Sequence, residues 1–224
     1  MLLWPALVLV ITGLPGTTQK VVNDDRELLQ AAMLSFFTPE PWHSGDWKPK
    51  KQVVLRSQFS SKTRPDFNAE LKNVSDRLKA EVDGLTKYIQ RGKVAPEQLR
   101  VLQKQLQASE QSLSQVAKIQ SKRTWVQSYT PPQLIPIKEM SWDGRILVSD
   151  QPSRRWSFQT KGDANIERLT VEARASRPTY SPDGSIAILH FGIPWSIHSS
   201  EVWMVYERIE STWVRRAVAS IFYV

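Results

Sequence analysis

The sequence predicts an α+β protein, in which an N-terminal helix and a long antiparallel helical hairpin precede an antiparallel sheet of four to six strands. Between residues 65 and 123, apolar residues recur every three or four positions, as on one face of a helix. From residue 124 onward, short β-rich runs alternate with Gly, Pro and Asp turn signals. We therefore divide the chain into a leader at 1–16, an N-terminal helix and strand at 17–64, the helical hairpin at 65–123 and the sheet region at 124–224.

Residues 1–16 form an apolar run that ends in Gly13-Leu14-Pro15-Gly16. The run is shorter than the roughly 20 apolar residues that span a bilayer, and it is typical of the hydrophobic region of a signal peptide. No Lys or Arg precedes it and it is followed by no Ala-x-Ala cleavage site, so the alternatives are an uncleaved N-terminal anchor or a wrongly assigned start codon. We expect a signal peptide, a mature chain without a transmembrane span, and a periplasmic or extracellular location in a bacterium.

The segment at 23–37 is predicted to be a helix. Asn23 can cap its start, and Asp24 and Asp25 suit the positive end of the helix dipole. Its apolar residues fall on one face: Leu28, Leu29, Ala32, Met33 and Phe36. After a loop rich in proline and charge, the run QVVLRSQF at 52–59 predicts a short strand.

The helical hairpin is predicted from two apolar stripes with a period near 3.5, which is also the period of a coiled coil. The stripes consist of Phe67, Leu71, Val74, Leu78, Val82, Leu85 and Ile89, and of Leu99, Leu102, Leu106, Leu113, Val116 and Ile119. Gly92 ends the first helix and Pro96 starts the second. We expect the stripes to pack mainly on each other, so that Leu78→Asp melts the hairpin and leaves the sheet folded. The alternative is a stripe completed by a protein partner or by a second copy of the chain.

Six β-rich runs are predicted to form the sheet: 145–149, 155–160, 166–173, 185–191, 201–209 and 213–224. In the run at 201–209, apolar side chains occupy both alternating sets of positions, so both faces of that strand should be covered. The sequence Ser181-Pro182-Asp183-Gly184 predicts a hairpin turn, because Pro182 presets its φ and Gly184 adopts the positive φ that closes the turn.

Residues 168–206 resemble one repeat of the β-propeller found in Tol-type periplasmic proteins, through RLT, the Ser-Pro-Asp-Gly turn and an apolar strand. A propeller needs at least four blades of four strands, and the sheet region has room for about six strands, so we reject a propeller. The order of segments, with Trp156 and Phe158 and the later pair Tyr206 and Trp213, is similar to that of uncharacterised exported bacterial α+β proteins. That resemblance implies the fold class and a bacterial envelope location, and it implies no catalytic residues.

The composition excludes several classes of site. The 224 residues include no cysteine, so the chain has no disulfide, thiolate metal site or cysteine nucleophile. An exported chain without cysteine suits the bacterial envelope at least as well as a eukaryotic secretory route, where disulfides are common. The net charge of +8 comes from basic residues spread along the chain, which favours at most a weak contact with an anionic surface and no nucleic-acid site.

The candidate chemistry is confined to the three histidines, His43, His190 and His198. Ser199 follows His198 and Asp183 is close in sequence, so one interpretation is a hydrolase that acts on an envelope substrate through His190 or His198. However, the sequence contains no G-x-S-x-G motif, no zinc-ligand spacing and no nucleotide-binding loop. We expect no metal and no cofactor. We favour a non-enzymatic binding or interaction module, with the helical hairpin as the surface for a partner or for self-association.

Overall fold

The computed structural model describes residues 17–37, 52–60, 64–92, 94–122, 125–126, 128–131, 136–140, 142–150, 170–195 and 198–223. The predicted leader at 1–16, the predicted strand at 155–160 with Trp156 and Phe158, and His43 lie outside this part of the chain. The described residues form helices and a mixed sheet, which confirms the α+β class.

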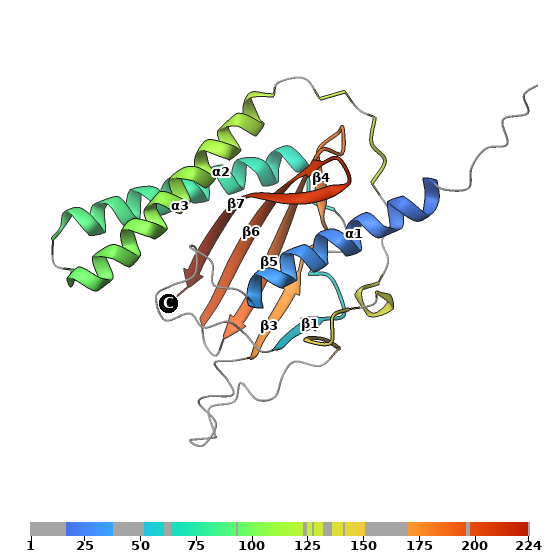
Figure 1. The fold of residues 1–224 in the computed structure, drawn as a ribbon, viewed down its shortest axis with the longest axis horizontal. Coiled ribbons are helices and arrows are strands. Elements are labelled where there is room, and N and C mark those ends of the chain that lie inside the picture. Colours follow the sequence, from blue (N-terminus) through green and yellow to red (C-terminus); the bar gives the residue numbers. More distant parts are fainter. Residues whose placement is uncertain are drawn as a thin grey trace, which may run out of the picture.

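Along the chain, most of the helical residues come before most of the strands. The helices are α1 (Thr17–Leu34), α2 (Phe67–Gln90) and α3 (Pro96–Ser121), with two short 3-10 helices, η1 (Ser35–Phe37) and η2 (Ile137–Glu139). The strands are β1 (Gln52–Arg56), β2 (Ile146–Ser149), β3 (Thr170–Ala175), β4 (Thr179–Tyr180), β5 (Ile186–Trp195), β6 (His198–Ile209) and β7 (Thr212–Tyr223). Figure 1 shows α1 lying across the sheet, and α2 and α3 extending past the strands.

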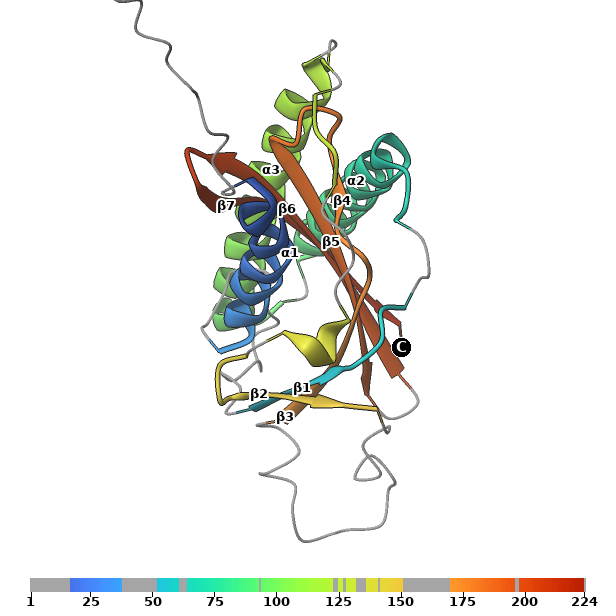
Figure 2. The ribbon, with the colours of Figure 1, turned by 90° about the vertical axis from the view of Figure 1, so that its right-hand side faces the viewer.

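The sheet is mixed rather than purely antiparallel, which corrects the prediction from the sequence. Its seven strands follow the order β2-β1-β3-β5-β6-β7, and β4 pairs with β5 outside this path. β1 pairs in parallel with both β2 and β3, whereas the other pairs are antiparallel. Parallel neighbours require a long crossover, and α2 and α3 lie within the crossover from β1 to β2. In Figure 2, β1, β2 and β3 lie at the end of the molecule away from α2 and α3.

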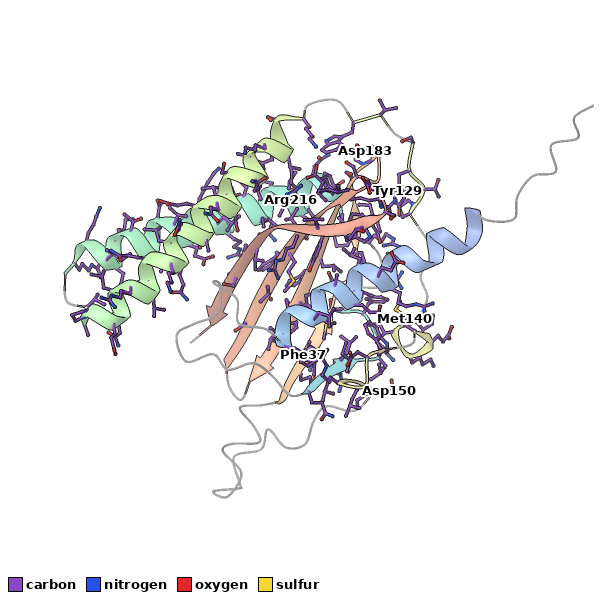
Figure 3. The ribbon with its side chains drawn as sticks, in the orientation of Figure 1. Phe37, Tyr129, Met140, Asp150, Asp183 and Arg216 are labelled. Atoms are coloured by element: carbon purple, nitrogen blue, oxygen red, sulfur yellow. The ribbon has the colours of Figure 1, made fainter. Side chains whose placement is uncertain are left out.

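The turn at 181–184 forms the predicted hairpin between β4 and β5. Gly184 has a φ of +71°, and its N–H donates to the Ser181 carbonyl oxygen at 2.9 Å. The Asp183 carboxylate accepts the backbone N–H of Ser185 at 3.0 Å, as expected of Asp in such a turn. Tyr129 lies against the turn (Figure 3), so a side chain at position 184 would overlap the Tyr129 ring.

We expect Gly184→Val to lower the free energy of unfolding by roughly 3 kcal/mol. Valine is strained at a positive φ, and its Cβ would lie 2.9 Å from the Cβ of Tyr129 and closer still to the ring. Chemical denaturation of the variant and the wild type measures the difference. Gly144→Val is the matched control, because nothing lies within 4 Å of a Cβ added at Gly144. Equal losses in the two variants would show that the turn does not require glycine.

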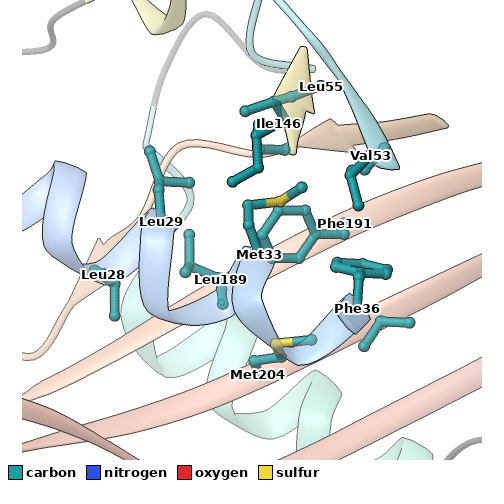
Figure 4. Packing of buried hydrophobic residues seen from close by; sticks show 14 of the residues in the cluster. Leu28, Leu29, Met33, Phe36, Val53, Leu55, Ile146, Leu189, Phe191 and Met204 are labelled. Atoms are coloured by element: carbon teal, nitrogen blue, oxygen red, sulfur yellow. The ribbon is translucent and has the colours of Figure 1, made fainter. Parts of the chain in front are cut away.

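Side chains on both faces of strands β5 and β6 are buried, as the pattern at 201–209 predicted. On the α1 side, Phe36 meets Phe191 edge to face, with ring centroids 6.0 Å apart, beside Met204 (Figure 4). On the opposite side, Trp203 belongs to a separate apolar cluster with Leu78 of α2. The molecule therefore has two apolar cores, one on each face of a shared sheet.

The apolar stripes of α2 and α3 pack on the sheet at one end of the two helices. The helical members of the cluster on this face are Phe67, Leu71, Val74, Leu78, Val116 and Ile119. They share it with residues of β5, β6 and β7, among them Ile188, Val205 and Ala217. The expectation that the stripes pack mainly on each other is therefore wrong at this end, because the sheet offers a second apolar surface there.

α1 begins at Thr17, six residues before the predicted cap at Asn23. Asn23, Asp24 and Asp25 consequently lie inside the helix and not in its first turn. Asp25 is 2% exposed and has an arginine partner from a distant segment. The predicted role of this carboxylate at a helix start is wrong, because a tertiary contact determines its position.

The outer edge of β7 is covered by side chains of α2 and α3. The Val218 N–H donates to the Ser112 Oγ at 3.3 Å. The Glu81 carboxylate accepts the backbone N–H of Ser220 and, at 2.9 Å, the hydroxyl of Ser109. Burial raises the pKa of Glu81, and these two hydrogen bonds lower it. Helical side chains thus occupy backbone groups to which another strand would otherwise bind.

Candidate functional site

His190 of β5 lies on the sheet face that α2 and α3 cover. Its ring stacks on the Trp203 indole of β6, with centroids 4.4 Å apart and planes 10° apart, because the two residues face each other in the strand register. The His190 Nε2 lies 3.8 Å from an oxygen of Glu201, which is two residues from Trp203 and on the same face of β6. Trp203 donates from Nε1 to Glu70 of α2 at 3.1 Å. The arrangement places an imidazole and two carboxylates around one indole.

Burial shifts the pKa of two groups in this cluster. It lowers the pKa of His190 below the ordinary value of 6.5, and the charge on Glu201 opposes the shift. Burial also raises the pKa of Glu70, which the hydrogen bond from Trp203 opposes. A neutral imidazole can act as a general base, but a hydrolase also requires a hydroxyl poised to react. The Ser176 hydroxyl nearby is buried and accepts the backbone N–H of His190 at 3.2 Å.

The other predicted site residues are not brought to His190. His198 opens β6, and its strand partner lies five residues beyond His190 along β5, or about 17 Å away. Ser199 follows His198 at the same end of the strands. Asp183 precedes β5, and its carboxylate is engaged in the turn. Among the described residues, the Ser-His-Asp arrangement of the hydrolase interpretation is not assembled.

Within the described ranges, no three side chains of His, Asp and Glu are grouped so that they could hold a metal ion. In the same part of the chain, no helix has both the length and the apolar character of a membrane span. For the residues outside those ranges, the absence of a metal site stays a prediction.

Between pH 7.5 and 5, we expect His190 to make stability fall as the pH falls. Its pKa is lower in the folded chain than in the unfolded chain, so below about pH 6.5 the unfolded chain binds a proton that the folded chain resists. The slope from one such group is at most about 1.4 kcal/mol per pH unit. Urea denaturation of the wild type and His190→Gln across this range measures it. Parallel stability curves for the two proteins would contradict the expectation.

A second polar cluster is buried on the α1 side. The Asp25 carboxylate accepts hydrogen bonds from the Arg64 Nη2 at 3.0 Å and from the Tyr180 hydroxyl. Arg64 also lies over the Tyr180 ring, 5.2 Å from its centroid. Burial and the adjoining Asp25 charge raise the pKa of Tyr180 well above its ordinary value. These groups bind one another inside the core, so the cluster joins α1, the segment before α2 and β4.

Residues 79–108 form what we call the arm, the outer part of α2 and α3, most of which extends past the strands (Figure 1), while Glu81 at its base still reaches the edge of β7. None of its described residues is buried. From Leu78 to Gln90, α2 rises roughly 18 Å at 1.5 Å per residue. On the arm, Tyr88 is 51% exposed and Val101 is 38% exposed. Neither residue belongs to the predicted stripes. Tyr88 could have been singled out from the sequence, because it is the one aromatic residue between 68 and 123.

The outer part of the arm is basic. Residues 87–104 contain five Lys or Arg residues and one Glu. The described cations in this stretch are Lys87, Arg91, Arg100 and Lys104, which are all exposed and form no ion pair with any described residue. At the other end of α3, in contrast, Lys122 pairs with Glu207 at 3.3 Å. This local bias escaped the sequence reasoning because basic residues are spread along the whole chain.

No family model, curated protein or solved structure matches this chain. The observations that bear on function are therefore its own: a mixed, largely antiparallel sheet, a half-buried histidine between a tryptophan and a glutamate, and a basic arm that extends past the sheet.

Proposed function

We propose that this chain is a non-enzymatic binding module, exported to the bacterial envelope. In this proposal an N-terminal helix and the sheet form a body, and an inserted antiparallel helical hairpin reaches out from the body to hold a partner. The body is supported by two apolar cores that share the long strands β5 and β6. The element that reaches out is the arm, and none of its described residues belongs to either apolar core.

The observation that carries the proposal is the absence of buried residues among the described residues of the arm. Fixing the backbone costs about 1–2 kcal/mol of conformational entropy per residue. In the arm, half-buried contacts between α2 and α3 and the hydrogen bonds of Glu81 at its base offset this cost, whereas nearer the sheet Leu78 and Val116 are fully buried. A segment that adds little to the core and is presented by a rigid scaffold is typical of a recognition element.

The positions of the candidate catalytic residues also favour a binding module over the hydrolase. His190 lies in the strand register with Trp203, while His198 and Ser199 lie at the far end of the same pair of strands. A catalytic imidazole must lie within hydrogen-bond reach of the group whose proton it takes. His190 does not lie within that reach of Ser199, whose strand partner is four residues further along β5.

The arm can be tested with one label, because the chain has no cysteine and any introduced cysteine is unique. We expect a spin label on Tyr88→Cys to become immobilised when the full chain is mixed with the envelope fraction of its source cells. Electron paramagnetic resonance reports the mobility of the label. The matched control is a label on Ile209→Cys, which is 44% exposed at the end of β6 and far from the arm in sequence.

The control label should keep its mobility when the envelope fraction is added. Immobilisation of both labels would indicate general adsorption of the protein and would refute a binding role for the arm. A mobile label at position 88 in the presence of the envelope fraction would refute it as well.

A further inference from the structure

We infer that the partner of the arm is an anionic phospholipid surface, which the tip of the arm contacts through its basic and apolar side chains. This inference rests on the proposed function and names the chemistry of the partner. We define the tip as residues 87–104, with a formal charge of +4 from five Lys or Arg residues and one Glu. The described cations of the tip are exposed and lack ion pairs with described residues, so their charge is available to a partner.

Each helix places an exposed apolar side chain beside a cation at the tip. On α2, Tyr88 precedes Arg91 by three residues, and on α3, Val101 precedes Lys104 by three. Residues three apart lie next to each other on a helix surface. Tyrosine rings and the stems of Lys and Arg are enriched where the headgroups of a bilayer meet its acyl chains. Both helices therefore place an exposed apolar side chain next to a cation at the tip, and the pair of Tyr88 and Arg91 on α2 has the residue types that suit this interface.

The size and charge of the tip favour a lipid surface over the other possible occupants. A specific protein interface buries about 800 Å² on each partner around an apolar centre, and the large exposed apolar side chains described at the tip are Tyr88 and Val101 alone. A second copy would bring another charge of +4 against the first. In contrast, each Lys or Arg near an anionic bilayer raises the partition coefficient about fivefold, so four cations together supply roughly six-hundredfold.

The experiment uses the full chain with an environment-sensitive nitrobenzoxadiazole dye on Tyr88→Cys. We expect vesicles of phosphatidylcholine with about one-third phosphatidylglycerol to shift its emission to the blue, and vesicles of phosphatidylcholine alone to leave it unchanged. In the same labelled background, changing Lys87, Arg91, Arg100 and Lys104 to Gln should lower the partition coefficient by roughly six-hundredfold. The matched control changes Lys72, Lys79, Lys118 and Lys138 to Gln, which removes the same charge away from the tip and should cost less than tenfold.

Three results would overturn the lipid inference. Equal losses in the two quadruple variants would show that the net charge of the whole chain, and not the tip, attracts the vesicles. Equal binding to neutral and anionic vesicles would remove the electrostatic basis. If neither kind of vesicle binds while the spin label at position 88 is still immobilised by the envelope fraction, the partner is a macromolecule other than lipid. In that last case the proposed function stands and the lipid inference falls.

Discussion

Leu78→Asp is expected to unfold the sheet and the helices together. Leu78 is fully buried and belongs to the apolar cluster that contains Trp203 and residues of β5, β6 and β7. Placing a charge there should cost more than about 5 kcal/mol, which is comparable to the whole stability of a typical domain. Circular dichroism should lose the far-ultraviolet helical signal and the near-ultraviolet tryptophan signal at the same denaturant concentration. This outcome is the opposite of the separable hairpin that the sequence suggested.

Two further variants keep this prediction testable if Leu78→Asp does not accumulate. Leu78→Ala should lower the free energy of unfolding by roughly 3 kcal/mol, through lost apolar contacts and the cavity that remains. Val101→Asp, on the half-exposed surface of the arm, should change it by less than about 1 kcal/mol. If Leu78→Asp lost helical signal and kept a native near-ultraviolet spectrum, the hairpin would be a separate folding unit after all.

Asp25→Ala is expected to lower the free energy of unfolding by roughly 3 kcal/mol. Removing the carboxylate takes away the anion that Arg64 Nη2 contacts at 3.0 Å and leaves the buried Tyr180 hydroxyl without the Asp25 acceptor. An unpaired group in a buried position costs more than the pair contributed when it was intact. Thermal unfolding followed by differential scanning calorimetry measures the loss.

Glu27→Ala is the matched control for Asp25→Ala, because Glu27 is exposed on the same helix and its removal should change little. Asp25→Asn should fall between the two, since an amide oxygen still accepts from the Tyr180 hydroxyl but no longer neutralises Arg64. An Asp25→Ala protein as stable as Glu27→Ala would mean that the cluster contributes nothing to the fold.

The parts of the fold that local chemistry decides could be predicted from the sequence. The turn at 181–184 needs a residue that tolerates positive φ, and Gly184 meets that need within four residues. The alternation at 201–209 likewise assigns Trp203 and Met204 to opposite faces. The parallel pairing of β1 was not predictable, because its apolar pattern suits either direction of neighbour. Its partners β2 and β3 follow only after α2 and α3.

In the candidate site too, single residues could be selected from the sequence, but their partners from distant segments could not. His190 is visible in the sequence, but Glu201 reaches it only through the register of β5 and β6. The buried role of Asp25 depends on Arg64, 39 residues away, so a reading of the local helix start assigns it wrongly. The exposure of Tyr88 depends on where the sheet ends relative to α2, which periodicity within the helix does not encode.

Because α2 and α3 occupy backbone groups along its outer edge, β7 is obstructed as a template for fibril growth. A twelve-residue strand with an open edge has unpaired backbone groups that can pair with the same strand of other copies, as in amyloid. Here the Ser112 hydroxyl and the Glu81 carboxylate hold two N–H groups of that edge. A proteolytic fragment that begins after residue 122 would lose both side chains and would aggregate from this strand. Two polar side chains of the helices thus oppose pairing of further strands with β7.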